Sequence, residues 1–138
     1  MTRLIFALAA FLALTGTGQA GGLDDARWCA KGTGDRDLDR YFCTLAIDSG
    51  DLSTETLAIT FNLRGITYNE KGDYDRAIED FDRAIELDPD YALAFNNKAW
   101  VLATASNAQV RDGREAVRLA REAVRLERFP INLVHTLS

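Results

Sequence analysis

The chain has 138 residues, of which 47% are hydrophobic and 27% are charged, and only two are prolines. This is the composition of an ordinary globular domain, and it excludes a disordered tail. Sixteen basic residues against 21 acidic ones give a formal net charge of −5. Because nucleic-acid binding needs clustered positive charge, this balance argues against nucleic acid as a partner.

Residues 1–20 have the three-part plan of a secretory signal peptide. Arg3 stands near the start, an apolar run follows from Leu4 to Leu14, and small residues lead to Ala20. The run is shorter than the ~20 residues that span a bilayer, and no cysteine follows the expected cleavage site after Ala20. We therefore expect an exported protein, periplasmic or alternatively secreted, with neither a transmembrane nor a lipoprotein anchor.

The glycines from Gly16 to Gly21 also match the spacing of a dinucleotide-binding fingerprint. That fingerprint requires a strand before it and a long helix after it within a βαβ unit. The stretch that follows Gly21 is charged and broken by glycines, and nothing later in the chain has the pattern of a parallel strand. We expect no nucleotide and no other cofactor.

Residues 21–57 contain both cysteines of the chain, Cys29 and Cys43. Oxidising compartments preserve disulfides, so export favours a bond between them over two free buried thiols. The acids Asp35, Asp37 and Asp39 resemble the start of a calcium loop, but the glycine and the closing glutamate of such a loop are absent. We expect these acids to support the start of a helix, and we expect no metal site.

Residues 58–91 and 92–127 repeat one another. A period in this range is typical of stacked helical units. The first helix recurs after 34 residues and its partner helix after 39, which leaves five extra residues in the second inter-helix loop, at 106–110. The shift of 34 aligns Ala58, Phe61, Asn62, Arg64, Gly65 and Tyr68 with Ala92, Phe95, Asn96, Lys98, Ala99 and Leu102. The shift of 39 aligns Ala77, Phe81, Ala84, Ile85 and Leu87 with Ala116, Ala120, Ala123, Val124 and Leu126.

Capping and stop signals mark the helix boundaries. Asp88 and Pro89 would end the helix that contains Ala77, because the residue before a proline is pushed out of the helical region. No alternation of apolar and polar residues indicates a strand, so the predicted fold class is all-α. The expected N-caps of the later helices are Asp73, Asp90 and Asp112.

The unit at 58–91 resembles the tetratricopeptide repeat. Its first helix has aromatic, small and aromatic residues, and its second has alanine, aromatic, alanine and then proline, as in that family, with Phe61 and Arg64 in place of the usual tryptophan and leucine. The resemblance implies a right-handed solenoid of about three helix-turn-helix hairpins. The packing residues that it implies are Gly65, Tyr68, Ala77, Phe81, Ala84 and Pro89 in the first unit and Ala99, Ala116, Ala120 and Ala123 in the second.

The two ends of the mature chain resemble incomplete units. Residues 37–48 align with a second helix, with Cys43 at the place of Phe81 and Asp39 where alanine is expected. Residues 21–57 would then be a degenerate first hairpin, stapled by a disulfide between Cys29 and Cys43. Residues 128–138 resemble the opening of a further helix, which would either form a truncated cap or leave an apolar face exposed.

The family resemblance implies binding of peptides or partner helices along the first helix of each unit. We therefore expect a protein-interaction scaffold of the bacterial cell envelope. The alternative is a self-assembling subunit that associates through its C-terminal end. The single histidine, His135, lies near the end of the chain, without a nucleophile arrangement or metal-ligand spacing, so we expect no enzyme. The expected groove is formed by Asn62, Ile66, Asn69, Asn96 and Trp100, although Ile66 and Trp100 also suit the core between units.

A stripe of arginines follows a 4-3-4-3 spacing on the last long helix. A solvated outer face, partly neutralised by Glu115, Glu122 and Glu127, is favoured over a contact with an anionic partner. The stripe consists of Arg114, Arg118, Arg121, Arg125 and Arg128.

Overall fold

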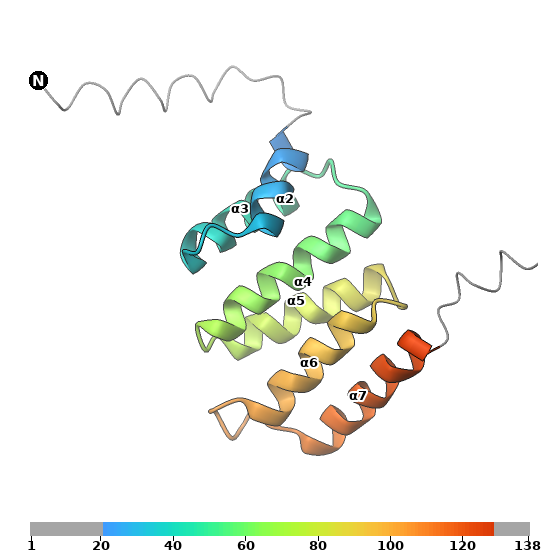
Figure 1. Ribbon diagram of the computed structural model, residues 1–138. Coiled ribbons are helices and arrows are strands. Elements are labelled where there is room, and N and C mark those ends of the chain that lie inside the picture. The colour runs from blue at the N-terminus through green and yellow to red at the C-terminus, as the bar shows by residue number, and fades with distance from the viewer. Residues whose placement is uncertain (1–20, 129–138) are drawn as a thin grey trace, which may run out of the picture.

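The structure, a computed structural model, describes residues 21–128, and over this range it contains six helices and no strand. The helices are α2 (Gly21–Lys31), α3 (Arg36–Asp48), α4 (Thr54–Glu70), α5 (Tyr74–Leu87), α6 (Ala92–Thr104) and α7 (Gly113–Arg128). They pair in chain order into three hairpins that stack side by side (Figure 1). The predicted all-α hairpin solenoid is confirmed, while the expected signal peptide at 1–20 and nearly all of the segment 128–138 lie outside the described residues.

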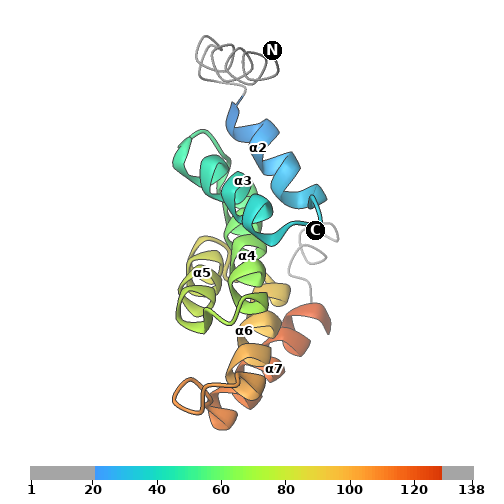
Figure 2. The same cartoon turned by 90° about the vertical axis from the view of Figure 1, so that its left-hand side faces the viewer.

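The α4–α5 hairpin lies in the middle of the stack, between α2–α3 on one side and α6–α7 on the other (Figure 2). Each hairpin therefore packs only on its neighbours in the sequence, as in other repeat proteins. The two outer hairpins each have one face that no other described helix covers.

Side-chain caps fix most of the helix starts. Asp35 accepts hydrogen bonds from the backbone N–H groups of two residues in the first turn of α3, Asp73 caps α5, and Asp112 accepts from the N–H of Glu115 in α7. The prediction for Asp90 is wrong, because Tyr91 is the N-cap residue of α6 and makes no side-chain bond there. Ser53 caps α4, so this helix begins at Thr54, ahead of the predicted unit boundary at 58.

The core between α4 and α5 is built from small residues around one ring. Ala77 and Ala84 are fully buried and Phe81 is 1% exposed. Gly65 lies so close to this ring that a Cβ atom there would stand 2.8 Å from Cε1 of Phe81. Small side chains thus allow the close crossing that the repeat pattern predicts.

The other residues predicted to pack fall into three groups. Ala99, Ala116 and Ala123 are buried between α6 and α7. Tyr68 and Ala120 are half-buried at the edges of the core. Pro89 is exposed, so it takes no part in the core and its role is confined to the segment that ends α5 at the extended residue Asp88.

The N-terminal hairpin is held by a disulfide and by a buried acid. Cys29 of α2 and Cys43 of α3 are bonded, with an S–S distance of 2.01 Å, which confirms the predicted disulfide. Asp39 is 2% exposed and accepts hydrogen bonds from the backbone N–H and the hydroxyl of Thr33 at 2.5 and 2.7 Å. The acid at the expected alanine position therefore ties the α2–α3 loop to α3.

Candidate functional site

Three large apolar side chains are exposed on the first helices of the second and third hairpins. Ile59 on α4 is 38% exposed, and Leu93 and Trp100 on α6 are 50% and 63% exposed. Ile59 and Leu93 occupy the same repeat position, 34 residues apart. We call the exposed residues Ile59, Asn69, Leu93, Asn96 and Trp100 the first-helix surface.

Asn62, which the sequence places in the binding groove, does not line it. Its side chain is 1% exposed and lies beneath the surface. Its Oδ1 accepts a hydrogen bond from Nδ2 of Asn97 at 2.9 Å, and its own Nδ2 donates to the hydroxyl of Tyr91 at 3.4 Å. The amide thus joins α4 to the start of α6. Burial raises the pKa of Tyr91, although the bond from Asn62 opposes this shift.

The other four predicted groove residues are not equivalent in exposure. Asn96 and Trp100 are exposed on α6, and Asn69 is partly exposed on α4. Ile66 is half-buried and packs against the cluster that contains Val101 and Ala105 of the next hairpin. Of the two roles open for Ile66 and Trp100, the structure places Ile66 between hairpins and Trp100 in solvent.

A hollow of about 430 Å³ lies between α6 and α7 beside Trp100. Its lining is largely apolar and includes Ala103, Val117 and Ala120. A second hollow of about 330 Å³ continues along α7 past Val124 and Arg121. We call the apolar surface formed by Trp100, Ala103, Val117, Ala120 and Val124 the end face.

Val117 and Val124 were not singled out as site residues in the sequence. They are 50% and 52% exposed. The available signal was their spacing, since two apolar residues seven positions apart lie on one side of an otherwise charged helix. Their exposure depends on which helix follows α7, and spacing alone does not determine this.

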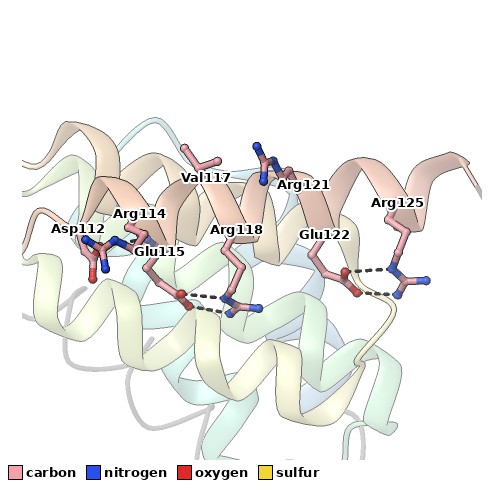
Figure 3. A pocket seen from close by; sticks show the side chains of 8 residues that line it. All are labelled: Asp112, Arg114, Glu115, Val117, Arg118, Arg121, Glu122 and Arg125. Atoms are coloured by element: carbon pink, nitrogen blue, oxygen red, sulfur yellow. Dashed lines mark hydrogen bonds and ion pairs between the residues drawn. The ribbon is translucent and has the colours of Figure 1, made fainter.

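The arginine stripe of α7 is divided between paired and outward-pointing side chains (Figure 3). Arg118 forms two hydrogen bonds with Glu115 at 2.7 and 2.8 Å, and Arg125 forms two with Glu122 at 2.6 and 3.0 Å. These contacts lower the pKa of each glutamate and raise that of each arginine. Val117 and Arg121 point away from the paired side chains, so the stripe borders the end face (Figure 3).

The described residues contain no group of three or more side chains suited to hold a metal ion. Asp35 and Asp39, two of the three acids that resemble a calcium loop, bind protein N–H and hydroxyl donors instead. Between residues 21 and 128, no helix is long and apolar enough to cross a membrane. His135 lies outside the described residues.

Comparison with known proteins gives one match. Residues 58–91 match the family model described as Tetratricopeptide repeat. The match covers most of α4, all of α5 and the turn that leads to α6. No curated protein and no solved structure matches the chain.

Proposed function

We propose, from the membership of this chain in the tetratricopeptide repeat family, that it is a non-catalytic module that binds another protein through its first-helix surface. Repeat proteins of this kind present extended surfaces built from equivalent positions of successive units. The first-helix surface has that character, because it combines side chains from α4 and α6.

The observation that carries the proposal is the exposure of Ile59 and Leu93 at one repeated position. Large apolar side chains that share a surface are typical of binding sites. The buried bonds of Asn62 to Asn97 and Tyr91 lie directly beneath and hold the two helices in register. A surface that is rigid before binding loses less conformational entropy when a partner binds.

The cell envelope is the proposed location. The signal-peptide pattern of residues 1–20 supports export, and a disulfide is the kind of bond that persists in an oxidising compartment. The partner would then be another exported or envelope-exposed protein.

In-cell cross-linking of the tagged full chain, followed by mass spectrometry, tests the proposal. The variant Ile59→Ser/Leu93→Ser should lose the cross-linked partner while keeping the far-UV circular dichroism of the parent. The matched control is Leu38→Ser/Tyr41→Ser, which removes two side chains of comparable exposure, 42% and 56%, from α3. Equal recovery of the partner by both variants would overturn the proposal.

Self-assembly through the C-terminal end is the second candidate, and the exposed apolar residues of the end face favour it. Sedimentation equilibrium of the full chain decides between the two. A mass that rises with concentration, and returns to that of one chain when Val124 is replaced by glutamate, would support self-assembly.

A further inference from the structure

Helix α6 shows what covers the exposed face of a hairpin in this protein. It packs on the α4–α5 hairpin, where Ile78 and Ile85 of α5 are half-buried. Ile78 packs against clusters that contain Val101 and Ala99 of α6, and Ile85 packs against the cluster that contains Ala94. The small residues of α6 let the helix approach closely.

The same positions recur, exposed, on the α6–α7 hairpin. Val117 and Val124 stand 39 residues after Ile78 and Ile85, and Trp100 stands 34 residues after Ile66. The three isoleucines are half-buried, whereas the three later residues are 50%, 52% and 63% exposed. The end face is therefore a second copy of the site that α6 occupies, without a covering helix in the described part of the chain.

The charge beside this site is reversed between the two hairpins. Nζ of Lys98 on α6 lies 2.6 Å from Oδ1 of Asp82 on α5. The residue 39 positions after Asp82 is Arg121, which borders the end face and forms no ion pair with any of the residues 21–128. A helix that binds the end face as α6 binds its own site would place its counterpart of Lys98 beside Arg121.

We propose that the end face binds an amphipathic helix of another protein that carries small residues along its contact face and an acidic residue where α6 has Lys98. Asn96 stands at the repeat position of Asn62, so it offers the bound helix the amide that Asn62 offers to Asn97. Residues 129–138 of this chain contain no acidic side chain, and Leu137 is the counterpart of Lys98 there. The charge of the site thus favours a helix from a different protein.

This site is separate from the proposed binding through Ile59 and Leu93. It rests on Val117, Val124 and Arg121 of α7, and it shares only Asn96 and Trp100 with the first-helix surface. A variant can therefore remove one site and leave the other.

A charge-swap binding experiment tests the proposal with a probe taken from the protein itself. The probe is a fluorescein-labelled peptide of residues 90–105, which contains α6, made with Lys98 and with Lys98→Glu. Fluorescence anisotropy at low salt measures its binding to the full chain. The glutamate peptide should bind about fivefold more tightly than the lysine peptide, because it replaces a repulsive surface pair with an attractive one.

The protein variant Arg121→Asp restores the charge of Asp82 and should reverse the order of the two peptides. The matched control is Arg118→Asp, which makes the same charge change where the side chain pairs with Glu115, and it should leave the order unchanged. Val124→Glu should abolish the binding of both peptides, and Ile59→Ser/Leu93→Ser should leave it intact.

Three outcomes would overturn the proposal. The first is equal binding of both peptides to the parent chain and to Arg121→Asp. The second is binding only after the chain is truncated behind Arg128, which would show that its own C-terminal segment occupies the face. The third is a dimer that Val124→Glu dissociates, which would assign the face to a second copy of the chain.

Discussion

Arg64 of α4 and Asp80 of α5 form a two-pronged ion pair inside the central hairpin. Nε and Nη2 of Arg64 each lie 2.8 Å from a carboxylate oxygen of Asp80. Nη1 reaches Oγ1 of Thr44 on α3 at 3.3 Å. The bonds to Asp80 raise the pKa of Arg64 despite its partial burial. One side chain therefore links three helices and two hairpins.

Removing Asp80 alone should destabilise the protein strongly. Asp80→Ala leaves the guanidinium of Arg64, whose side chain is only 16% exposed, without its carboxylate. We expect a loss of about 3 kcal/mol in the free energy of unfolding, as for other broken buried pairs. Arg64→Leu/Asp80→Leu should lose far less, since the second hairpin has Leu119 at the place of Asp80, buried at 2%.

Urea unfolding followed by circular dichroism measures both variants. Asp75→Ala, on the exposed first turn of the same helix, is the control and should change the unfolding free energy by less than about 0.5 kcal/mol. A double-leucine variant as unstable as Asp80→Ala would show that the ion pair stabilises the hairpin by itself, beyond avoiding an unpaired charge.

The sequence predicted the hairpins but not which repeated residues would be buried. The periods of 34 and 39 residues follow from side chains that must meet across each hairpin, so they define the helices. Asn62 and Asn96 occupy the same repeat position, yet the first is buried and the second is exposed. Their difference arises from the neighbouring hairpin, because α6 covers Asn62 and no described helix covers Asn96.

Arg64 was visible in the sequence as a departure from the leucine of the family pattern. Its partner was not, because Asp80 is one of many acids on α5 and only the crossing of α4 and α5 selects it. The disulfide was easier to predict, since the chain has only two cysteines. Paired residues that come from separate helices need a geometry that helical spacing alone does not supply.

Gly65 should not tolerate even one added methyl group. The Cβ atom of an alanine there would lie 2.8 Å from Cε1 of Phe81 and 3.2 Å from the carbonyl oxygen of Ala77. Overpacking of this kind costs about 1–3 kcal/mol, whereas replacing glycine within a helix gains only about 1 kcal/mol. We expect Gly65→Ala to lower the midpoint of urea unfolding. The second hairpin has Ala99 at this position, with Ala120 where Phe81 would be.

Gly113→Ala is the control for this substitution, because no atom outside its immediate surroundings lies within 4 Å of a Cβ atom built there. It should leave stability unchanged or raise it slightly. If both alanine variants unfold at the same urea concentration, the close contact between Gly65 and Phe81 does not limit the packing of α4 on α5.

Reduction of the disulfide should weaken the first hairpin more than the others. Cys29 and Cys43 are 14 positions apart, and closing a loop of this length stabilises a protein by about 3 kcal/mol through the entropy of the unfolded chain. Hydrogen exchange of the Cys29→Ser/Cys43→Ser variant should show faster exchange in α2 and α3. Amides of α6 and α7 are the internal control, and equal acceleration throughout would mean that the hairpins unfold as one unit.

Acidification should destabilise the α2–α3 hairpin through Asp39. Burial opposes ionisation of this carboxyl, but the two hydrogen bonds from Thr33 and the charge of Arg36 outweigh it, so its pKa lies below the usual value. The folded protein therefore releases this proton more readily than the unfolded chain. The resulting stabilisation is complete above about pH 4, the ordinary aspartate range, and is lost as the pH falls through the lowered pKa.

Asp39→Asn removes the titration and keeps an oxygen that can accept a bond from Thr33. The unfolding free energy of the variant should fall less steeply than that of the parent between about pH 5 and pH 2. Asp37→Asn, on the exposed side of the same helix turn, serves as the charge-matched control. Parallel pH profiles for the parent and Asp39→Asn would show that this carboxyl titrates alike in the folded and unfolded chains. Its bonds to Thr33 would then contribute nothing to the pH dependence of stability.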